Sequence, residues 1–137
     1  MQPDEGTMKD LVRYRLEKAE VDLTSAKALL DLKDFLGANN RAYYSIYHSI
    51  SAVQGLDGKT YKRHKDAIAN FNKDYVKTEI FPRMLGHKIA LASEIRHSSD
   101  YDDFYIATRA ESEEQIKTAE ELLQAVNSYI DERLSHQ

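Results

Sequence analysis

Apolar side chains recur along most of this chain at steps of three and four residues, which is the spacing of one face of an α-helix. The pattern predicts helices over residues 8–34, 39–54, 62–76 and 80–97, followed by a last helix after residue 108. Thr108 and Glu111 form a T-x-x-E capping box, which is the clearest helix start in the sequence. No alternating segment of useful length predicts a strand.

Short connections separate the predicted helices. We expect Gly37 to end the first helix and the turn at residues 55–58 to end the second. The periodicity is lost from Ser98 to Tyr105, which predicts a loop that carries three acids and three aromatic side chains. Because short connections force neighbouring helices to run antiparallel, the predicted fold is all-α: an antiparallel up-down four-helix bundle with one additional short helix.

Length and composition narrow the class of protein. A chain of 137 residues is the size of one domain, so we expect residues 1–137 to form a single helical domain with a core over about residues 8–134. The absence of cysteine excludes disulfides and thiolate metal sites. The five histidines form no metal-ligand spacing, so we expect no metal and no cofactor. No long apolar run or signal peptide is present, so we expect a cytoplasmic protein that does not contact a membrane.

The charge distribution is more informative than the net charge. With 23 acids against 19 bases the chain carries a formal charge of −4, which argues against a non-specific binder of duplex DNA. However, the four bases Lys59, Lys62, Arg63 and Lys65 lie within seven residues that contain no acid. This cluster is either a solvated helix start or a small patch that attracts phosphate.

The second predicted helix carries the first candidate site. Arg41 and His48 are seven residues apart, so both side chains leave the same face, two turns or about 10.5 Å apart, with Tyr44 between them. A guanidinium that grips phosphate and an imidazole that titrates near pH 6.5 can converge on one anion. The alternative is that Arg41 and His48 make only structural hydrogen bonds.

The second candidate site is the segment from Arg96 to Tyr101. Arg96 and Asp100 have the i,i+4 spacing of a helical ion pair, which is the structural interpretation. In the functional interpretation Arg96 meets phosphate, Asp100 orients a neighbouring group, and His97 or Tyr101 handles a proton.

Together these two segments resemble the HEPN family (higher eukaryotes and prokaryotes nucleotide-binding). Residues 40–50 resemble its R-A-Y-Y-x-x-[FY]-H signature, and residues 96–101 resemble the R-x-x-x-D-Y segment that follows some fifty residues later. The resemblance covers about residues 8–134 and is closest to small stand-alone prokaryotic members. It implies a helical bundle, a homodimer and, as a frequent partner, a small nucleotidyltransferase-type protein in a toxin–antitoxin pair.

The resemblance also implies two functions for the same residues. In the first, the protein binds RNA or a nucleotide and is a metal-independent endoribonuclease. Its catalytic residues would be Arg41, His48 and Arg96, and its phosphate-binding residues would be Arg41, Tyr44, Arg96, His97, Asp100 and Tyr101. In the second, it is a catalytically silent interaction module. The motivation for the second is that the family's R-x(4–6)-H spacing, counted from Arg96, reaches Tyr101 rather than a histidine.

Overall fold

The computed structural model describes residues 5–136 and is entirely helical within that range. The elements are α1 (Glu5–Asp31), α2 (Phe35–Leu56), α3 (His64–Phe71), the π-helical turn η1 (Asn72–Val76), α4 (Arg83–Tyr101) and α5 (Arg109–Ser135). The predicted all-α class is therefore confirmed. None of the helices in this range is both long and apolar enough to cross a membrane.

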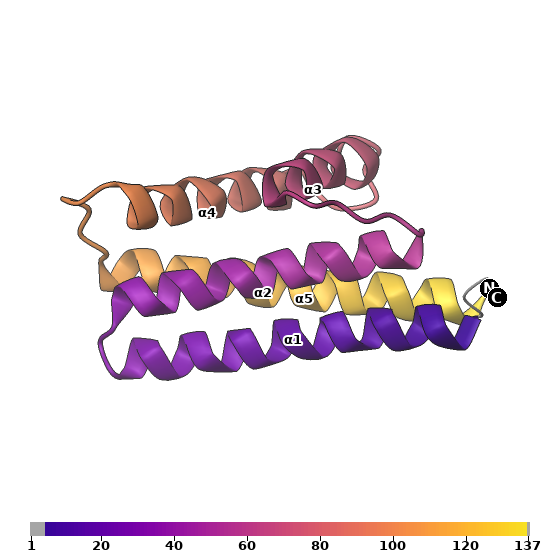
Figure 1. The fold of residues 1–137 in the computed structure, drawn as a ribbon, viewed down its shortest axis with the longest axis horizontal. Helices are drawn as coiled ribbons and strands as arrows, with labels where there is room; N and C mark the ends of the chain where they lie inside the picture. Colours follow the sequence, from indigo (N-terminus) through magenta and orange to yellow (C-terminus); the bar gives the residue numbers. More distant parts are fainter. Residues whose placement is uncertain (1–4, 137) are drawn as a thin grey trace.

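Helix α2 lies at the centre of the molecule. It packs against α1 and α5 along most of its length and also contacts α3 and α4. Figure 1 shows that α1, α2, α4 and α5 lie roughly side by side and that the chain reverses direction from each of these helices to the next. The short α3 lies on the same side of α2 as α4, so α2 is covered on several faces.

The contact between α1 and α2 is built from small side chains. Ala19, Ala26, Ala38 and Ala42 are fully buried, and the buried Ser45 hydroxyl donates a 2.7 Å hydrogen bond to the carbonyl oxygen of Ala19. Larger apolar side chains fill the remaining core between α2, α4, α5 and η1, including those of residues 46, 50, 71, 89, 122 and 126. Burial of each such side chain stabilises the fold by about 1.5–3 kcal/mol.

The connection between α1 and α2 differs from the prediction. Gly37 does not end the first helix but lies in the first turn of α2, where its N–H donates a 2.9 Å hydrogen bond to the Asp34 carboxylate. Helix α1 instead ends at Asp31, and Lys33, two residues later, adopts the left-handed φ of 64°. The N–H groups of Lys33 and Asp34 each donate a 2.9 Å hydrogen bond to the carbonyls of Leu30 and Leu29, the pattern of a Schellman motif. By accepting the hydrogen bond from the Gly37 N–H, the Asp34 carboxylate also caps the N-terminus of α2.

The end of α4 also differs from the prediction. Residues 98–101 were expected in a loop but form the last turn of α4. This turn has no apolar stripe, and two local polar interactions stabilise it instead. The Ser99 hydroxyl donates a 2.8 Å hydrogen bond to the Ile95 carbonyl, and Nε of Arg96 lies 3.5 Å from Oδ2 of Asp100. Thr108 caps α5 as predicted, because its hydroxyl accepts a 3.2 Å hydrogen bond from the Glu111 N–H. The Glu111 carboxylate, which a capping box would direct back to Thr108, instead accepts hydrogen bonds from the Asn39 amide, at 2.9 Å, and from the Tyr105 hydroxyl.

Asp57 ties three elements together at the end of α2. Its carboxylate accepts a 2.7 Å hydrogen bond from Arg133 of α5 and another from the Tyr75 hydroxyl of η1. Burial raises the pKa of Asp57, but the hydrogen bonds from Arg133 and Tyr75 outweigh it and leave the pKa below its ordinary value. The ionised carboxylate is therefore the form that the fold prefers.

We predict that Asp57→Asn lowers the free energy of unfolding by about 1–2 kcal/mol at pH 7, because the Arg133 contact is partly exposed to solvent. Since the folded-state pKa is depressed, this stabilisation is present above the unfolded pKa of about 3.9 and is lost as pH falls through the folded value. Urea unfolding of both proteins at pH 7 and pH 3 measures the effect. Equal stability at pH 7, or an equal difference at both pH values, would contradict the prediction.

Candidate anion-binding site

Arg41 and His48 lie on one face of α2, and a carboxylate from α1 joins them. The Nη1 atom of Arg41 is 3.1 Å from Oδ1 of Asp22, and the Nε2 atom of His48 is 3.4 Å from Oδ2. The Asp22 side chain is only 13% exposed, so this carboxylate is largely withdrawn from water. Asp22 therefore orients the guanidinium and the imidazole toward each other.

Tyr44 brings the two candidate segments together. Its ring centroid is 4.9 Å from Cζ of Arg41 and 5.6 Å from Cζ of Arg96, so arginines from α2 and α4 contact the same aromatic ring. Arg96 also donates a 3.3 Å hydrogen bond to the Tyr44 hydroxyl. Two cations that are far apart in the sequence are thus neighbours in the fold.

Arg96 is held mainly by aromatic rings. Its Cζ atom lies 5.0 Å from the Tyr43 ring centroid. Its Nε atom lies 3.5 Å from Oδ2 of Asp100, yet this buried N–H has no hydrogen-bond partner in the part of the chain that the structure describes. An unsatisfied buried donor is uncommon in folded proteins, and here it belongs to a cation that adjoins a hollow.

Two further residues of the site were not predicted. Asp22 is one, and the other is His64 of α3, whose Nδ1 atom lies 3.1 Å from the Tyr43 hydroxyl. The His64 ring also packs edge-on against Tyr47, with ring centroids 3.7 Å apart. His64 belongs to the basic segment at residues 59–65, which was the available sequence signal. For Asp22 the signal is weaker, since it only flanks the buried stripe of α1.

Burial tunes the titratable groups of the site. The pKa of His48 lies below its ordinary value because burial disfavours the imidazolium more than Asp22 favours it. Burial and then the charge of Arg96 lower the pKa of His64. Burial raises the pKa of Tyr43 to about 12, against the opposing effect of Arg96. At neutral pH both imidazoles are therefore uncharged and able to accept a proton, whereas Tyr43 keeps its own.

The remaining predicted residues lie along α4. His97 and Tyr101 are one turn apart, with ring centroids 4.8 Å apart, and Tyr101 is 73% exposed. Asp100 borders a hollow of about 370 Å³ together with Arg41. The structure therefore brings Arg41, Tyr44, His48 and Arg96 together and places Asp100 at their edge. His97 and Tyr101 contact each other instead of His48.

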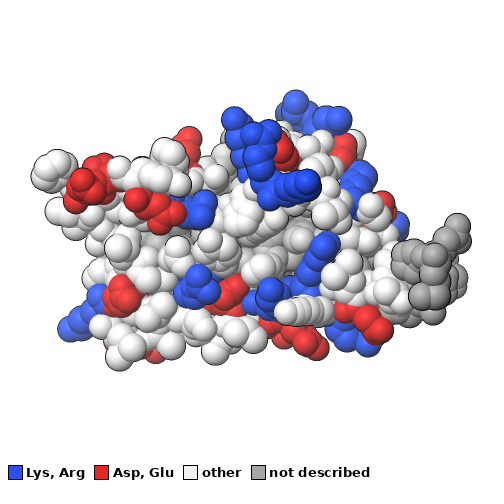
Figure 2. All heavy atoms as spheres, in the orientation of Figure 1, with Lys and Arg blue, Asp and Glu red and all other residues white. Residues whose placement is uncertain are grey.

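Two features of the surface surround this site. A hollow of about 720 Å³ between α3 and α4 is lined by Tyr43, His64, Arg96 and His97, among others. On the face shown in Figure 2, basic residues gather over the upper middle of the molecule. Acidic residues lie toward the end where α4 finishes and also along the lower edge, next to further basic residues. No group of three or more His, Asp or Glu side chains within residues 5–136 is arranged to hold a metal ion.

Comparison with known proteins identifies the family of this chain. The family described as "HEPN domain" matches residues 12–129. The chain is 28% identical over 122 residues to a "UPF0332 protein" of Thermotoga maritima, a match that covers 89% of this chain and 92% of the relative. It is 29% identical over 94 residues to a protein of Methanocaldococcus jannaschii named "putative toxin", covering 69% of this chain and 70% of the relative.

The fold is also shared with a solved structure. The crystal structure of TT1696 from Thermus thermophilus aligns with a TM-score of 0.73 and 22% sequence identity, covering 85% of this chain and 96% of that one. The sequence resemblance is thus confirmed by a family match that spans most of the chain. This protein belongs to the HEPN domain family.

Proposed function

We propose that this HEPN protein binds an RNA or nucleotide phosphate at the Arg41–Tyr44–Arg96 cluster and acts in a two-component system of the toxin–antitoxin kind. The observation that carries the proposal is the convergence of Arg41 and Arg96 on one tyrosine ring beside a hollow. The relative named "putative toxin" supports the biological role. The proposed scaffold is a single domain built as an antiparallel up-down four-helix bundle with a short fifth helix, and its working form is a homodimer.

The chemistry that the cluster fits best is metal-independent cleavage of RNA. The RNA 2′-oxygen bonds to the adjacent phosphorus while the bond from phosphorus to the 5′-oxygen breaks, which yields a 2′,3′-cyclic phosphate and a 5′-hydroxyl. His48 accepts the proton of the 2′-hydroxyl, and a water molecule donates the proton that the departing 5′-oxygen takes up. With Nε2 facing Asp22, Nδ1 carries the free lone pair for this step. Arg41 and Arg96 stabilise the charge that develops on the phosphate oxygens.

The outer residues of α4 complete the proposed contact with RNA. His97, Asp100 and Tyr101 lie on the last two turns of α4, beyond Arg96. Tyr101 is exposed enough to stack on a base, and His97 lies against its ring. In this proposal these three residues bind the nucleotide and do not take part in proton transfer.

A second candidate function is a catalytically silent module that binds a nucleotidyltransferase-type protein. The observation that favours it is the engagement of both Arg41 and His48 by the same carboxylate of Asp22. In this case the ion pairs fix the surface of α2, and the cluster recognises an acidic group of the partner. Both candidates use the same residues, and they differ in whether RNA is cleaved.

We predict that Arg41→Ala weakens binding of a fluorescein-labelled single-stranded oligouridylate about tenfold in fluorescence anisotropy, because one charge-assisted contact to phosphate is lost. Arg109→Ala is the matched control. Arg109 is likewise paired with a carboxylate, 3.8 Å from Glu113, and stacked on an aromatic ring, 5.2 Å from Phe35. Equal affinities of the two variants would remove Arg41 from the phosphate site.

We predict that the wild-type protein cleaves single-stranded RNA in EDTA, that His48→Ala abolishes cleavage, and that the control His136→Ala, at an exposed position after α5, does not. Because the pKa of His48 is lowered, the base form persists into mild acid, so the rate should rise with pH around a midpoint below pH 6.5. Gel analysis of the products over pH 4–8 measures this. Intact RNA that is nevertheless bound would support the silent module instead.

A further inference from the structure

An RNA strand bound at Arg96 has to continue across the surface, and three hollows adjoin the anion-binding site. The hollow that Arg41 borders also contains the acids Asp34 and Asp100. The hollow on α1 contains Glu17 and Asp22. Each of these two hollows is bordered by two acids and a single base, Arg41 or Lys18, so neither attracts further phosphates of the backbone. The third hollow, between α3 and α4, is bordered mostly by positive charges.

The third hollow is part of a longer groove. It shares Ile68, Ala69 and Ala90 with a neighbouring hollow of about 780 Å³, so the two are continuous. We call them together the α3–α4 groove. Along α4 it runs from Arg96 to Arg83, which is about 20 Å at the rise of an α-helix.

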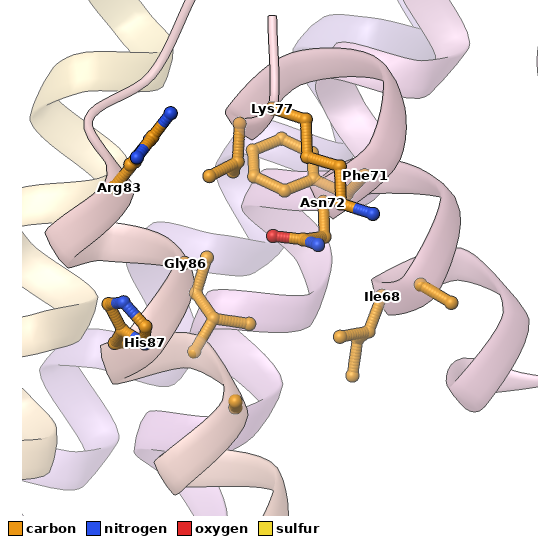
Figure 3. Close-up of a pocket in the computed structure, with 11 residues that line it drawn as sticks. Ile68, Phe71, Asn72, Lys77, Arg83, Gly86 and His87 are labelled. Carbon is orange, nitrogen blue, oxygen red and sulfur yellow. The ribbon is translucent and has the colours of Figure 1, made fainter. Parts of the chain in front are cut away.

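Basic side chains line both walls of the α3–α4 groove. The α4 wall carries the cations Arg83 and Arg96 together with His87 and His97, and the opposite wall carries the cations Lys65 and Lys77 together with His64, which is uncharged at neutral pH. Figure 3 shows Arg83 and His87 on one side of the hollow and Ile68, Asn72 and Lys77 on the other. Among the residues that the structure describes, Glu94 is the single acid that borders either hollow.

The other cations of the groove, besides Arg96, are available for a ligand. Neither Lys65 nor Lys77 forms an ion pair within residues 5–136. Arg83 lies 4.0 Å from Glu79, and both of these side chains are more than 70% exposed. An exposed pair at this distance holds its charges weakly, so a phosphate can take the place of the carboxylate at low cost.

Apolar side chains also line the groove, namely those of Ile68, Ala69, Val76, Ile89 and Ala90. A single-stranded nucleic acid exposes the faces of its bases, which can pack against these apolar side chains while its phosphates contact the cations of the groove. A duplex hides those faces and offers only its backbone. We propose that the α3–α4 groove holds single-stranded RNA that extends from the phosphate at Arg96 toward Lys77 and Arg83. This proposal rests on the phosphate site proposed above.

The test uses the double variant Lys77→Ala/Arg83→Ala with two labelled ligands, a decauridylate and the dinucleotide UpU, in fluorescence anisotropy over a series of salt concentrations. We expect the affinity for the decamer to fall about tenfold and the slope of log K against log salt to shrink by about 1.4, for two lost phosphate contacts. Affinity for UpU should not change, because a dinucleotide at Arg96 does not reach the far end of the groove.

The matched control is Lys27→Ala/Arg109→Ala, which removes the same charge from positions that do not border the α3–α4 groove. If the groove variant and this control bind the decamer with equal affinity and salt slope, the proposal is wrong and an acidic protein segment becomes the better occupant. That result leaves the proposed function intact as long as Arg41→Ala still weakens binding. If the wild-type protein binds no decamer, both proposals fail.

Discussion

The close packing of α1 on α2 determines the geometry of the anion-binding site. Ala19 and Ala42 are fully buried, and Ser45 donates its hydrogen bond to the Ala19 carbonyl across the helix contact. Small side chains let the two backbones approach closely, and Asp22 lies one turn beyond Ala19 on the same helix. This proximity is what lets a carboxylate of α1 reach both Arg41 and His48 of α2.

The local charges of the site nearly cancel, which constrains how it can bind an anion. Arg41 and Arg96 carry two positive charges, Asp22 and Asp100 carry two negative charges, and His48 is neutral at pH 7 because burial lowers its pKa. Net attraction therefore contributes little at this point. If the cluster binds phosphate as proposed, that binding depends on directed hydrogen bonds from the two guanidinium groups. In the proposal for the α3–α4 groove, the long-range attraction comes from Lys65, Lys77 and Arg83 instead.

Sequence periodicity identified the helices well but not the polar neighbours of the site. The apolar stripes at three- and four-residue steps identify the buried faces of α2 and α5, and they depend only on local spacing. Asp22 and His64 were missed because they join the site through contacts that span 19 and 21 residues of chain, which no local pattern encodes. The last turn of α4 was missed because its support is polar, from Ser99 and Asp100. In contrast, the two family segments were enough to indicate which helices meet.

Asp22 is the residue on which the two candidate functions divide. A phosphate at the cluster competes with Asp22 for Arg41, whose side chain is 39% exposed and can turn toward solvent. His48 is less exposed, at 23%, and its neutral ring keeps its contact with Asp22 when Arg41 leaves. The carboxylate then holds the imidazole in one tautomer, as a catalytic base requires. If Arg41 stays on Asp22 instead, neither group is free for chemistry, and the same surface can only bind.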